Sequence, residues 1–160
     1  MTTARAARNA ATSLSTLHAP RGSKRSLEGV VVLAVDDDDD ARELLLTLLE
    51  QRHATVFVAS NARDAFALFK AGQPHVIVSD IAMPNEDGYA LIRRIRALSE
   101  SNGGRTPAIA VTAYAGTSHR ALALDAGFDL HVPKPVDLDA LVEAILSLYD
   151  ARESPPRSHF

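Results

Sequence analysis

Cysteine and tryptophan are absent from the sequence, and aromatic residues are few, with five phenylalanines and three tyrosines among 160 residues. Without cysteine the chain can form no disulfide framework and no thiolate site, which excludes zinc ribbons, iron–sulfur clusters and cysteine nucleophiles. The longest apolar run, residues 30–35, is far shorter than the roughly 20 residues that span a bilayer. The first residues also lack the apolar stretch of a secretory signal. We therefore expect a cytoplasmic protein that is not embedded in a membrane.

Charged residues are unevenly distributed along the chain. The whole sequence has 17 Lys and Arg against 20 Asp and Glu, a formal net charge of −3, which does not favour nucleic-acid binding by the whole chain. Residues 1–28 contain five basic residues and one acid, whereas residues 29–150 contain ten basic and eighteen acidic residues. A basic leader therefore precedes an acidic body.

Both ends of the chain lack a regular pattern. Residues 1–28 are rich in Ala, Ser, Thr and Arg and follow neither a helical nor a strand period, which predicts a disordered basic tail. An inert linker is the simplest role for this tail, but its charge also suits folding back onto the acidic body or tethering a partner. Residues 151–160 contain Pro155–Pro156 and predict a short disordered tail.

Five short apolar segments alternate with five helical patterns between the tails. The apolar segments lie at residues 30–35, 55–58, 75–79, 108–112 and 129–132, and the helical patterns at residues 41–49, 62–69, 91–98, 118–126 and 138–149. The first segment is apolar throughout, which is typical of a strand buried on both faces of a parallel sheet. The alternation predicts a three-layer α/β domain over residues 29–150. Neither G-x-G-x-x-G nor the P-loop motif occurs, and the absence of these motifs disfavours the nucleotide-binding proteins that share this architecture.

Polar residues follow the predicted strands where each strand ends. Asp36 and Asp37 follow the first strand, Asp80 the third and Lys134 the fifth, while Thr112 closes the fourth. The carboxyl ends of parallel strands meet at one edge of a sheet, so we expect these side chains to lie together. Neighbouring carboxylates favour a hard divalent cation such as Mg²⁺. Such an ion, an ammonium and a hydroxyl can together hold the oxygens of a phosphoryl group, which predicts a carboxylate that accepts phosphate.

Each of these residues also has a structural explanation when it is taken alone. The acidic run 36–40 fits a solvated loop, in which Asp38 is well placed as the N-cap of the next helix. A threonine within a strand is usually a packing residue, and a lysine after a strand is usually a surface charge. The joint placement at several strand ends is what favours a functional site.

Four stretches of the sequence resemble the receiver domain of two-component response regulators. They read VVLAVDDDDDARELL, VIVSDIAMPNEDGYALIRRIR, AIAVTAYA and VPKPVDLDALVEAI, and the resemblance covers about residues 29–148. It implies a doubly wound, flavodoxin-like fold with a five-stranded parallel sheet of order 2-1-3-4-5.

The resemblance also implies roles for the clustered residues. Asp80 matches the phosphoacceptor, which receives its phosphate from a histidine kinase or a histidine phosphotransfer protein. Asp36 and Asp37 match the acidic pair that binds Mg²⁺, with Asp37 as a direct ligand and Asp36 acting through water. The backbone carbonyl of Ala82, two residues past the acceptor, is the third protein ligand that the family implies.

The last two matches come from the second half of the chain. Thr112 corresponds to the switch hydroxyl of the family, and Lys134 to the lysine that contacts the phosphate. The family usually has a cis peptide before the following proline, which predicts a cis Lys134–Pro135 bond. His131 departs from the pattern, because stand-alone receivers often carry Tyr or Phe there. A histidine resembles receivers of hybrid sensor kinases, and we expect it to be a half-buried packing residue rather than a relay group.

Few residues follow the last helical pattern, and their number limits how the protein can pass on a signal. Eleven residues after Tyr149 are too few for a DNA-binding or enzymatic domain, so we expect a stand-alone receiver and not a multi-substrate enzyme. Such a protein signals through protein contact, or serves as a phosphate shuttle or sink. The resemblance implies that a downstream target binds the fourth helix, fifth strand and fifth helix, near residues 119–149.

Two other functions stay open at this point. A phosphatase of the haloacid dehalogenase type would use Asp36 as its nucleophile and Asp38 as its acid. However, Asp40–Ala41 stand near where that family has a threonine, and there is no cap insertion. A receiver that binds partners without phosphorylation is the other alternative, although no expected site residue is missing.

Overall fold

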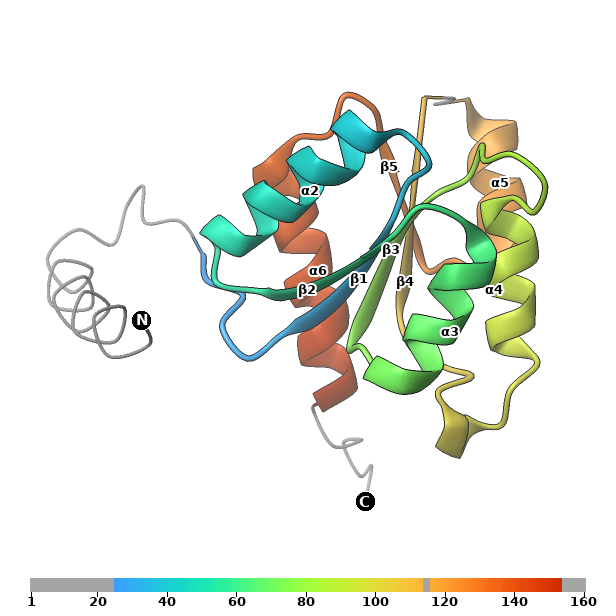
Figure 1. Cartoon of the computed structure of the whole chain (residues 1–160), viewed down its shortest axis with the longest axis horizontal. Coiled ribbons are helices and arrows are strands. Elements are labelled where there is room, and N and C mark those ends of the chain that lie inside the picture. The colour runs from blue at the N-terminus through green and yellow to red at the C-terminus, as the bar shows by residue number, and fades with distance from the viewer. Residues whose placement is uncertain (1–24, 114–115, 154–160) are drawn as a thin grey trace, which may run out of the picture.

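The computed structural model describes residues 25–113 and 116–153, which form a parallel sheet with helices on both faces (Figure 1). The strands are β1 (Val31–Val35), β2 (Thr55–Ala59), β3 (Val76–Asp80), β4 (Ala108–Thr112) and β5 (Leu130–Pro133). The helices are α2 (Asp39–Gln51), α3 (Ala62–Gly72), α4 (Gly88–Arg96), α5 (Thr117–Ala126) and α6 (Leu138–Glu153), with a 3-10 helix, η1 (Glu100–Asn102), after α4. None of these helices is long and apolar enough to cross a membrane.

The sheet has the predicted topology. Its strands are all parallel and pair in the order β2-β1-β3-β4-β5, which confirms the doubly wound fold. Helices α2 and α6 cover one face of the sheet, and α3, α4 and α5 cover the other (Figure 1). Because every strand points the same way, the carboxyl ends share one edge, and the loops that leave this edge lead into the helices.

Strand β1 is buried on both faces, which explains its uninterrupted apolar sequence. Val32 and Ala34 pack beneath α2 and α6, whereas Leu33 and Val35 pack with α3 and α4 on the opposite face. All four side chains have no exposed surface. A strand in this position cannot alternate polar and apolar residues, because each of its faces meets a helical layer.

Capping side chains fix the start of three helices at the carboxyl edge. Asp38 accepts two backbone N–H hydrogen bonds from the first turn of α2, at 2.9 and 3.2 Å, which confirms its predicted N-cap role. Asn61 and Asp87 each accept one such bond at the start of α3 and α4. Each cap contributes about 1 kcal/mol to helix stability. The caps thus set where the loops beside the sheet end.

The folded part of the chain extends beyond residues 29–150 at both ends. Leu27 has no exposed surface, packs in the core cluster beneath α2 and α6, and donates its N–H to the carbonyl of Arg52 at 2.6 Å. At the other end, α6 continues to Glu153. A single leucine in a polar segment has no periodicity that a sequence pattern can register. The rest of the expected tails, residues 1–24 and 154–160, lies outside the described residues.

Replacing Leu27 tests this boundary. Leu27→Ala should lower the free energy of unfolding by about 2–4 kcal/mol, because the side chain is fully buried in the core. Urea unfolding followed by circular dichroism measures the change. Leu44→Ala is the matched control, since Leu44 is 58% exposed, and it should change stability by about 0.5 kcal/mol or less. Equal effects of the two substitutions would contradict the placement of Leu27 in the core.

Candidate functional site

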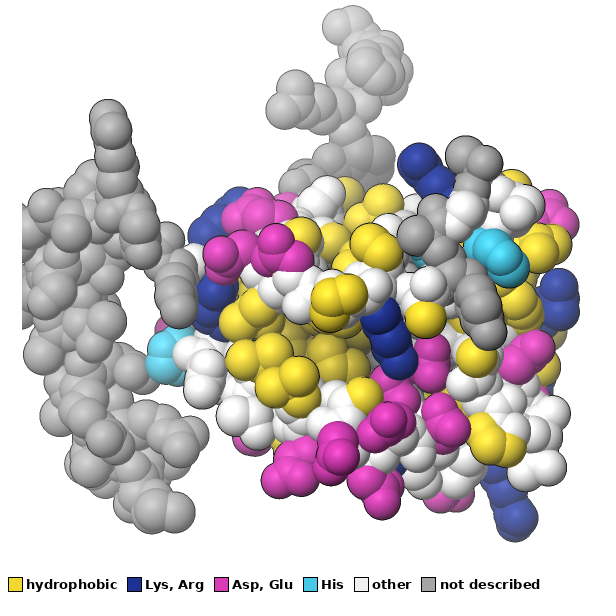
Figure 2. Space-filling model, turned by 90° about the horizontal axis from the view of Figure 1, so that it is seen from above, with side chains coloured by type: hydrophobic (Ala, Val, Ile, Leu, Met, Phe, Trp, Pro, Cys, Tyr) yellow, Lys and Arg dark blue, Asp and Glu magenta, His cyan; other side chains and the backbone are white. Residues whose placement is uncertain are grey.

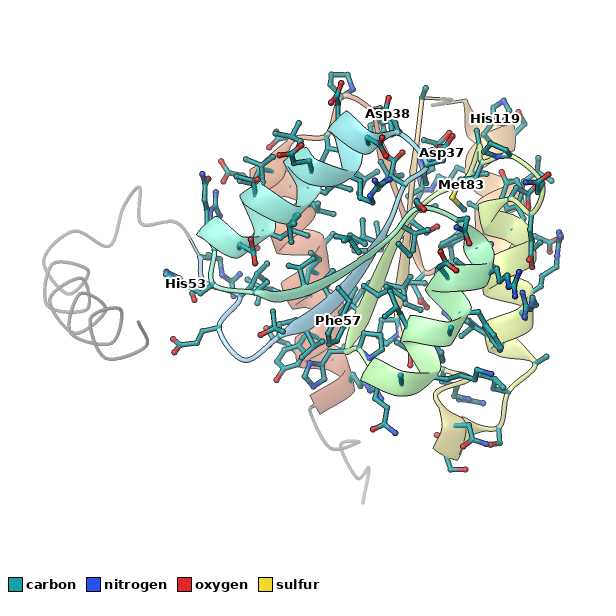
Figure 3. The ribbon with its side chains drawn as sticks, in the orientation of Figure 1. Asp37, Asp38, His53, Phe57, Met83 and His119 are labelled. Atoms are coloured by element: carbon teal, nitrogen blue, oxygen red, sulfur yellow. The ribbon has the colours of Figure 1, made fainter. Side chains whose placement is uncertain are left out.

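Three carboxylates meet at the carboxyl edge of the sheet. Asp36 directly follows β1 and Asp80 ends β3, and these two strands are hydrogen-bonded neighbours. Asp36, Asp37 and Asp80 each offer an oxygen that lies within 4.8 Å of the other two. Asp36 and Asp80 are only 1% and 7% exposed, whereas Asp37 is exposed at the upper end of the molecule (Figure 3). The predicted acidic cluster is therefore formed, and it reaches the surface at Asp37.

Lys134 brings a positive charge to this cluster from a distant part of the sequence. Its Nζ lies 3.1 Å from Asp36 Oδ2 and 3.6 Å from Asp80 Oδ2. The Lys134–Pro135 peptide bond is cis, as predicted. The backbone N–H of Lys134 donates to the carbonyl of Thr112 at 2.8 Å, which ties the segment after β5 to the end of β4.

The two remaining predicted residues lie at the same edge of the sheet. Thr112 ends β4, pairs with Pro133 of β5 and is 2% exposed. Ala82 lies two residues after Asp80, in the loop between β3 and α4, and it is exposed. The structure thus brings the three carboxylates and the lysine together, and it places Thr112 and Ala82 on adjoining segments.

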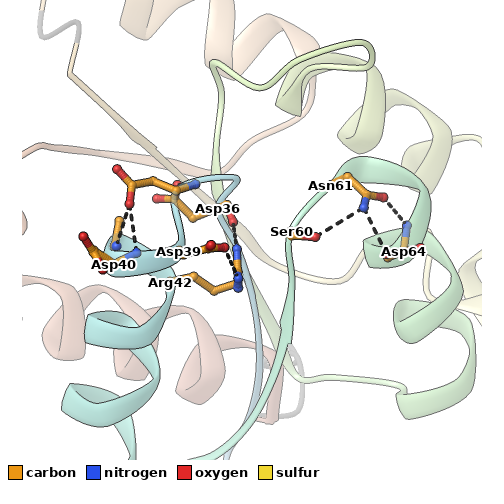
Figure 4. Close-up of polar contacts among 9 residues, drawn as sticks. Asp36, Asp39, Asp40, Arg42, Ser60, Asn61 and Asp64 are labelled. Carbon is orange, nitrogen blue, oxygen red and sulfur yellow. Dashed lines mark hydrogen bonds and ion pairs between the residues drawn. The ribbon is translucent and has the colours of Figure 1, made fainter.

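Asp36 is held in place by its own loop and by α2 (Figure 4). Its Oδ1 accepts the backbone N–H of Asp38 at 2.9 Å. Its carbonyl accepts Nη1 of Arg42 at 2.9 Å, and Arg42 also pairs with Asp39. The sequence reasoning missed Arg42. The sequence did offer a sign of its role, because Arg42 is a single cation two residues after five consecutive acids.

Gly88 lets α4 approach the end of β3 closely. A Cβ at this position would lie 2.5 Å from the carbonyl oxygen of Asp80 and 2.9 Å from the Cα of Ile81. The N–H of Gly88 donates to the carbonyl of Ile81 at 2.9 Å. Only glycine fits so close to the backbone of the site. This residue was also missed, although the Asp87–Gly88 pair before a helical pattern was available as a signal.

The charges of the cluster shift the ionisation of two side chains. Burial, and then repulsion by Asp36, raises the pKa of Asp80 to about 6, against the opposing pull of Lys134. Burial alone would lower the pKa of Lys134. Hydrogen bonds and ion pairs with Asp36 and Asp80 outweigh this effect, so the pKa of Lys134 lies above its usual value. A further cation beside the carboxylates would relieve the repulsion that keeps the pKa of Asp80 high.

His131 lies on β5 opposite Ala110 of β4. Ala110 packs in the cluster formed with α3, α4 and α5, so the register places His131 on that side of the sheet. The residue is half-buried, and its Nε2 is buried without a hydrogen-bond partner among the described residues. Its partial burial agrees with a packing role for the imidazole ring, which stays a prediction.

The raised pKa of Asp80 predicts a pH-dependent stability in the absence of metal. The folded state holds the Asp80 proton more tightly than the unfolded chain does. Proton binding therefore stabilises the fold at low pH, and this stabilisation is lost as the pH rises through about 6. Relative to Asp80→Asn, wild type should lose roughly 1 kcal/mol of unfolding free energy between about pH 5 and about pH 8. Urea unfolding in EDTA at several pH values measures this difference. A difference that does not change with pH would contradict the assigned cause.

Comparison with known sequences agrees with this geometry. The model of the response regulator receiver domain matches residues 32–146. The uncharacterised 14.6 kDa protein in the sodA1 3' region of Leptolyngbya boryana is 44% identical over 121 residues, which covers 76% of this chain and 91% of that protein. Hybrid signal transduction histidine kinase D of Dictyostelium discoideum is 34% identical over 142 residues, which covers 84% of this chain but only 9% of the kinase. The chain thus spans most of one relative and a small part of the other.

Solved structures with the same fold include two receiver domains. The receiver domain of Francisella response regulator 1452 matches with a TM-score of 0.71 and 29% identity, covering 78% of this chain and 100% of that chain. The receiver domain of Saccharomyces cerevisiae Ssk1, solved with the histidine phosphotransfer protein Ypd1, matches with a TM-score of 0.71 and 25% identity, covering 77% and 90%. The family model spans most of the described chain and the fold agrees with it, so this chain belongs to the response regulator receiver domains of two-component signalling.

Proposed function

We propose that Asp80 accepts a phosphoryl group from the phosphohistidine of a histidine kinase or a histidine phosphotransfer protein. The observation that carries the proposal is the position of Asp80 at a strand end, beside two further carboxylates and the Lys134 ammonium. The Asp80 carboxylate attacks phosphorus as the phosphorus–nitrogen bond of the donor breaks. The electron pair of that bond stays on the donor imidazole, and an aspartyl phosphate forms on this chain.

The carboxylate cluster has the oxygen donors that a hard divalent cation prefers. Asp37 and Asp80 are the proposed direct ligands, Asp36 acts through water, and the backbone carbonyl of Ala82 completes the protein ligands. The exposure of Asp37 leaves room for the waters that Mg²⁺ retains. Mg²⁺ bound here supplies positive charge that neutralises the carboxylates and the oxygens of the incoming phosphoryl group.

Lys134 and Thr112 hold the phosphoryl group in this proposal. Lys134 Nζ stands 3.6 Å from the Asp80 carboxylate, within reach of a phosphoryl oxygen attached to it. Thr112 follows Val111, the partner of Asp80 in the neighbouring strand β4. Its hydroxyl is the proposed donor to a second phosphoryl oxygen, and its movement toward that oxygen would carry the change to the rest of the domain.

The proposed output surface is formed by α5, β5 and α6, between residues 119 and 149. Leu122 and Leu124 on α5 are 52% and 44% exposed, so this face offers apolar side chains to a partner protein. We propose that the protein works in the cytoplasm through such contacts, or as a phosphate shuttle or sink, and not as a multi-substrate enzyme.

Phosphorylation by a small donor tests the acceptor. Incubation with acetyl phosphate and Mg²⁺ should add one phosphoryl group, because the site itself supplies the groups that neutralise the transferred oxygens. Intact-protein mass spectrometry measures the addition. EDTA or Asp80→Asn should abolish it. A phosphoryl group that persists in Asp80→Asn but disappears in Asp36→Asn would contradict the proposal and support a phosphatase-like nucleophile at Asp36.

Metal binding should stabilise the folded protein through the same cluster. At a Mg²⁺ concentration about 100-fold above its dissociation constant, the expected gain in unfolding free energy is about 2.7 kcal/mol, visible as a higher Tm in a thermal scan. Asp37→Ala should abolish the rise. Asp40→Ala is the matched control, because Asp40 is an exposed acid of the same run outside the cluster. An equal loss in both variants would mean that Mg²⁺ acts by general screening.

A further inference from the structure

Helices α2 and α6 lie on the same face of the sheet (Figure 1). An apolar hollow opens between them in the view from above (Figure 2). Figure 2 shows hydrophobic side chains lining this hollow, with acidic side chains on both sides of it. Leu44 on α2 is 58% exposed, and Leu48 follows it on the same side of the helix. Val136 and Leu138 lie half-buried against the core beneath α2 and α6. We call the hollow between α2 and α6 the α2–α6 groove, and these four residues are incompletely buried apolar residues of the segments beside it.

The groove adjoins the phosphoryl site. Helix α2 starts two residues after Asp37, and Val136 follows Lys134 by two residues. A protein that carries a phosphohistidine to Asp80 must rest on the surfaces around this edge, and the groove is an apolar surface next to it. Covering the groove would therefore hinder a protein donor, a consequence that rests on the function proposed above.

The chain enters the fold beside the groove. Arg25 pairs with Glu143 of α6 at 2.9 Å, and its carbonyl accepts Nη1 of Arg52 at 3.5 Å. Arg52 is 5% exposed and pairs in turn with Asp139 in the first turn of α6. These contacts, with the buried Leu27, fix the point from which the preceding residues leave the fold. That point lies along the first two turns of α6.

The rim of the groove and the preceding residues carry opposite charges. Six exposed acids lie in the first turns of α2 and α6 or directly before α6: Asp39, Asp40, Glu43, Asp137, Asp139 and Glu143. Three of them pair with arginines of the fold, which leaves Asp40, Glu43 and Asp137 to attract further positive charge. Residues 1–24 contain neither Asp nor Glu, and their basic residues are Arg5, Arg8, Arg21 and Lys24. Leu14 and Leu17 stand between these cations. Two leucines flanked by positive charges complement an apolar hollow with an acidic rim.

We propose that residues 1–24 dock in the α2–α6 groove through Leu14 and Leu17 and compete with the phosphodonor protein for it. The eight residues from Leu17 to Arg25 span up to about 26 Å when extended, more than the length of two helical turns. Tethering gives the segment an effective concentration of order mM, so a weak contact suffices to keep it bound. A small donor such as acetyl phosphate does not need the groove and escapes this competition.

A spin label tests the docking without any phosphorylation. Because the sequence lacks cysteine, Thr12→Cys offers a single site for a nitroxide two residues before Leu14. The label should broaden the amide NMR signals of Leu44, Leu48 and Leu138 more than those of α3, which lies on the opposite face of the sheet. Absent broadening, or equal broadening over the whole surface, would overturn the proposal and leave the groove to a separate protein.

Charge substitutions test what holds the segment. A quadruple variant of the 160-residue chain, Arg5→Gln, Arg8→Gln, Arg21→Gln, Lys24→Gln, should lose the selective broadening, because the acidic rim no longer attracts residues 1–24. Arg63→Gln is the matched control, since Arg63 is an exposed cation on α3. Equal loss of broadening in the control and the quadruple variant would contradict a contact that depends on the basic segment.

Rates of phosphorylation test the competition. The unlabelled quadruple variant should accept phosphate from a phosphorylated histidine phosphotransfer protein, with Ypd1 the first to be tried, about 5- to 10-fold faster than wild type, as expected for a groove occupied about 80–90% of the time. Its rate with acetyl phosphate should be unchanged. Equal rates with the protein donor would overturn the competition. If neither wild type nor the quadruple variant is phosphorylated by either donor, the proposed function is wrong. The spin-label experiment then still tests whether residues 1–24 bind the groove.

Discussion

Repulsion among three carboxylates is the constraint around which this domain is organised. Asp36, Asp37 and Asp80 offer oxygens within 4.8 Å of one another, and burial keeps water from screening two of them. Lys134 is the one ammonium ion-paired within this cluster among the described residues, and it pairs with both buried acids. One positive charge cannot balance three negative ones, so the folded protein retains a local excess of negative charge. This excess favours a bound cation over further negative charge, so the phosphoryl transfer proposed above depends on the metal ion as well as on Lys134.

Much of the architecture could be predicted from the sequence because strands and helices bury their residues differently. The apolar segments at residues 30–35 and 108–112 mark strands covered on both faces, and the helical patterns between segments imply parallel connections. Strand order came from the family resemblance instead, since it depends on which helices cover each face. The core role of Leu27 could not be predicted, because one buried side chain in a polar segment has no period.

Site residues that stand at strand ends could be predicted from the sequence, whereas residues that contact the main chain of the site could not. Asp36, Asp80 and Lys134 follow strands that share an edge, so their meeting could be inferred from spacing. Arg42 and Gly88 instead act on main-chain carbonyls, one by donating to Asp36 and the other by leaving space beside Asp80. No pattern of side-chain types reveals a partner of that kind.

The place of β1 and β3 inside the sheet has a consequence for local opening. Each of these strands has a neighbour on both sides, whereas β2 and β5 form the edges. Amide protons of inner strands exchange with solvent only through large, rare openings of the molecule. Asp36 follows β1 and Asp80 ends β3, two of the three inner strands, while α5 stands beside the edge strand β5. We therefore expect the proposed phosphoacceptor to lie on a part of the domain that opens rarely, and the proposed output helix α5 to lie beside a part that opens more readily.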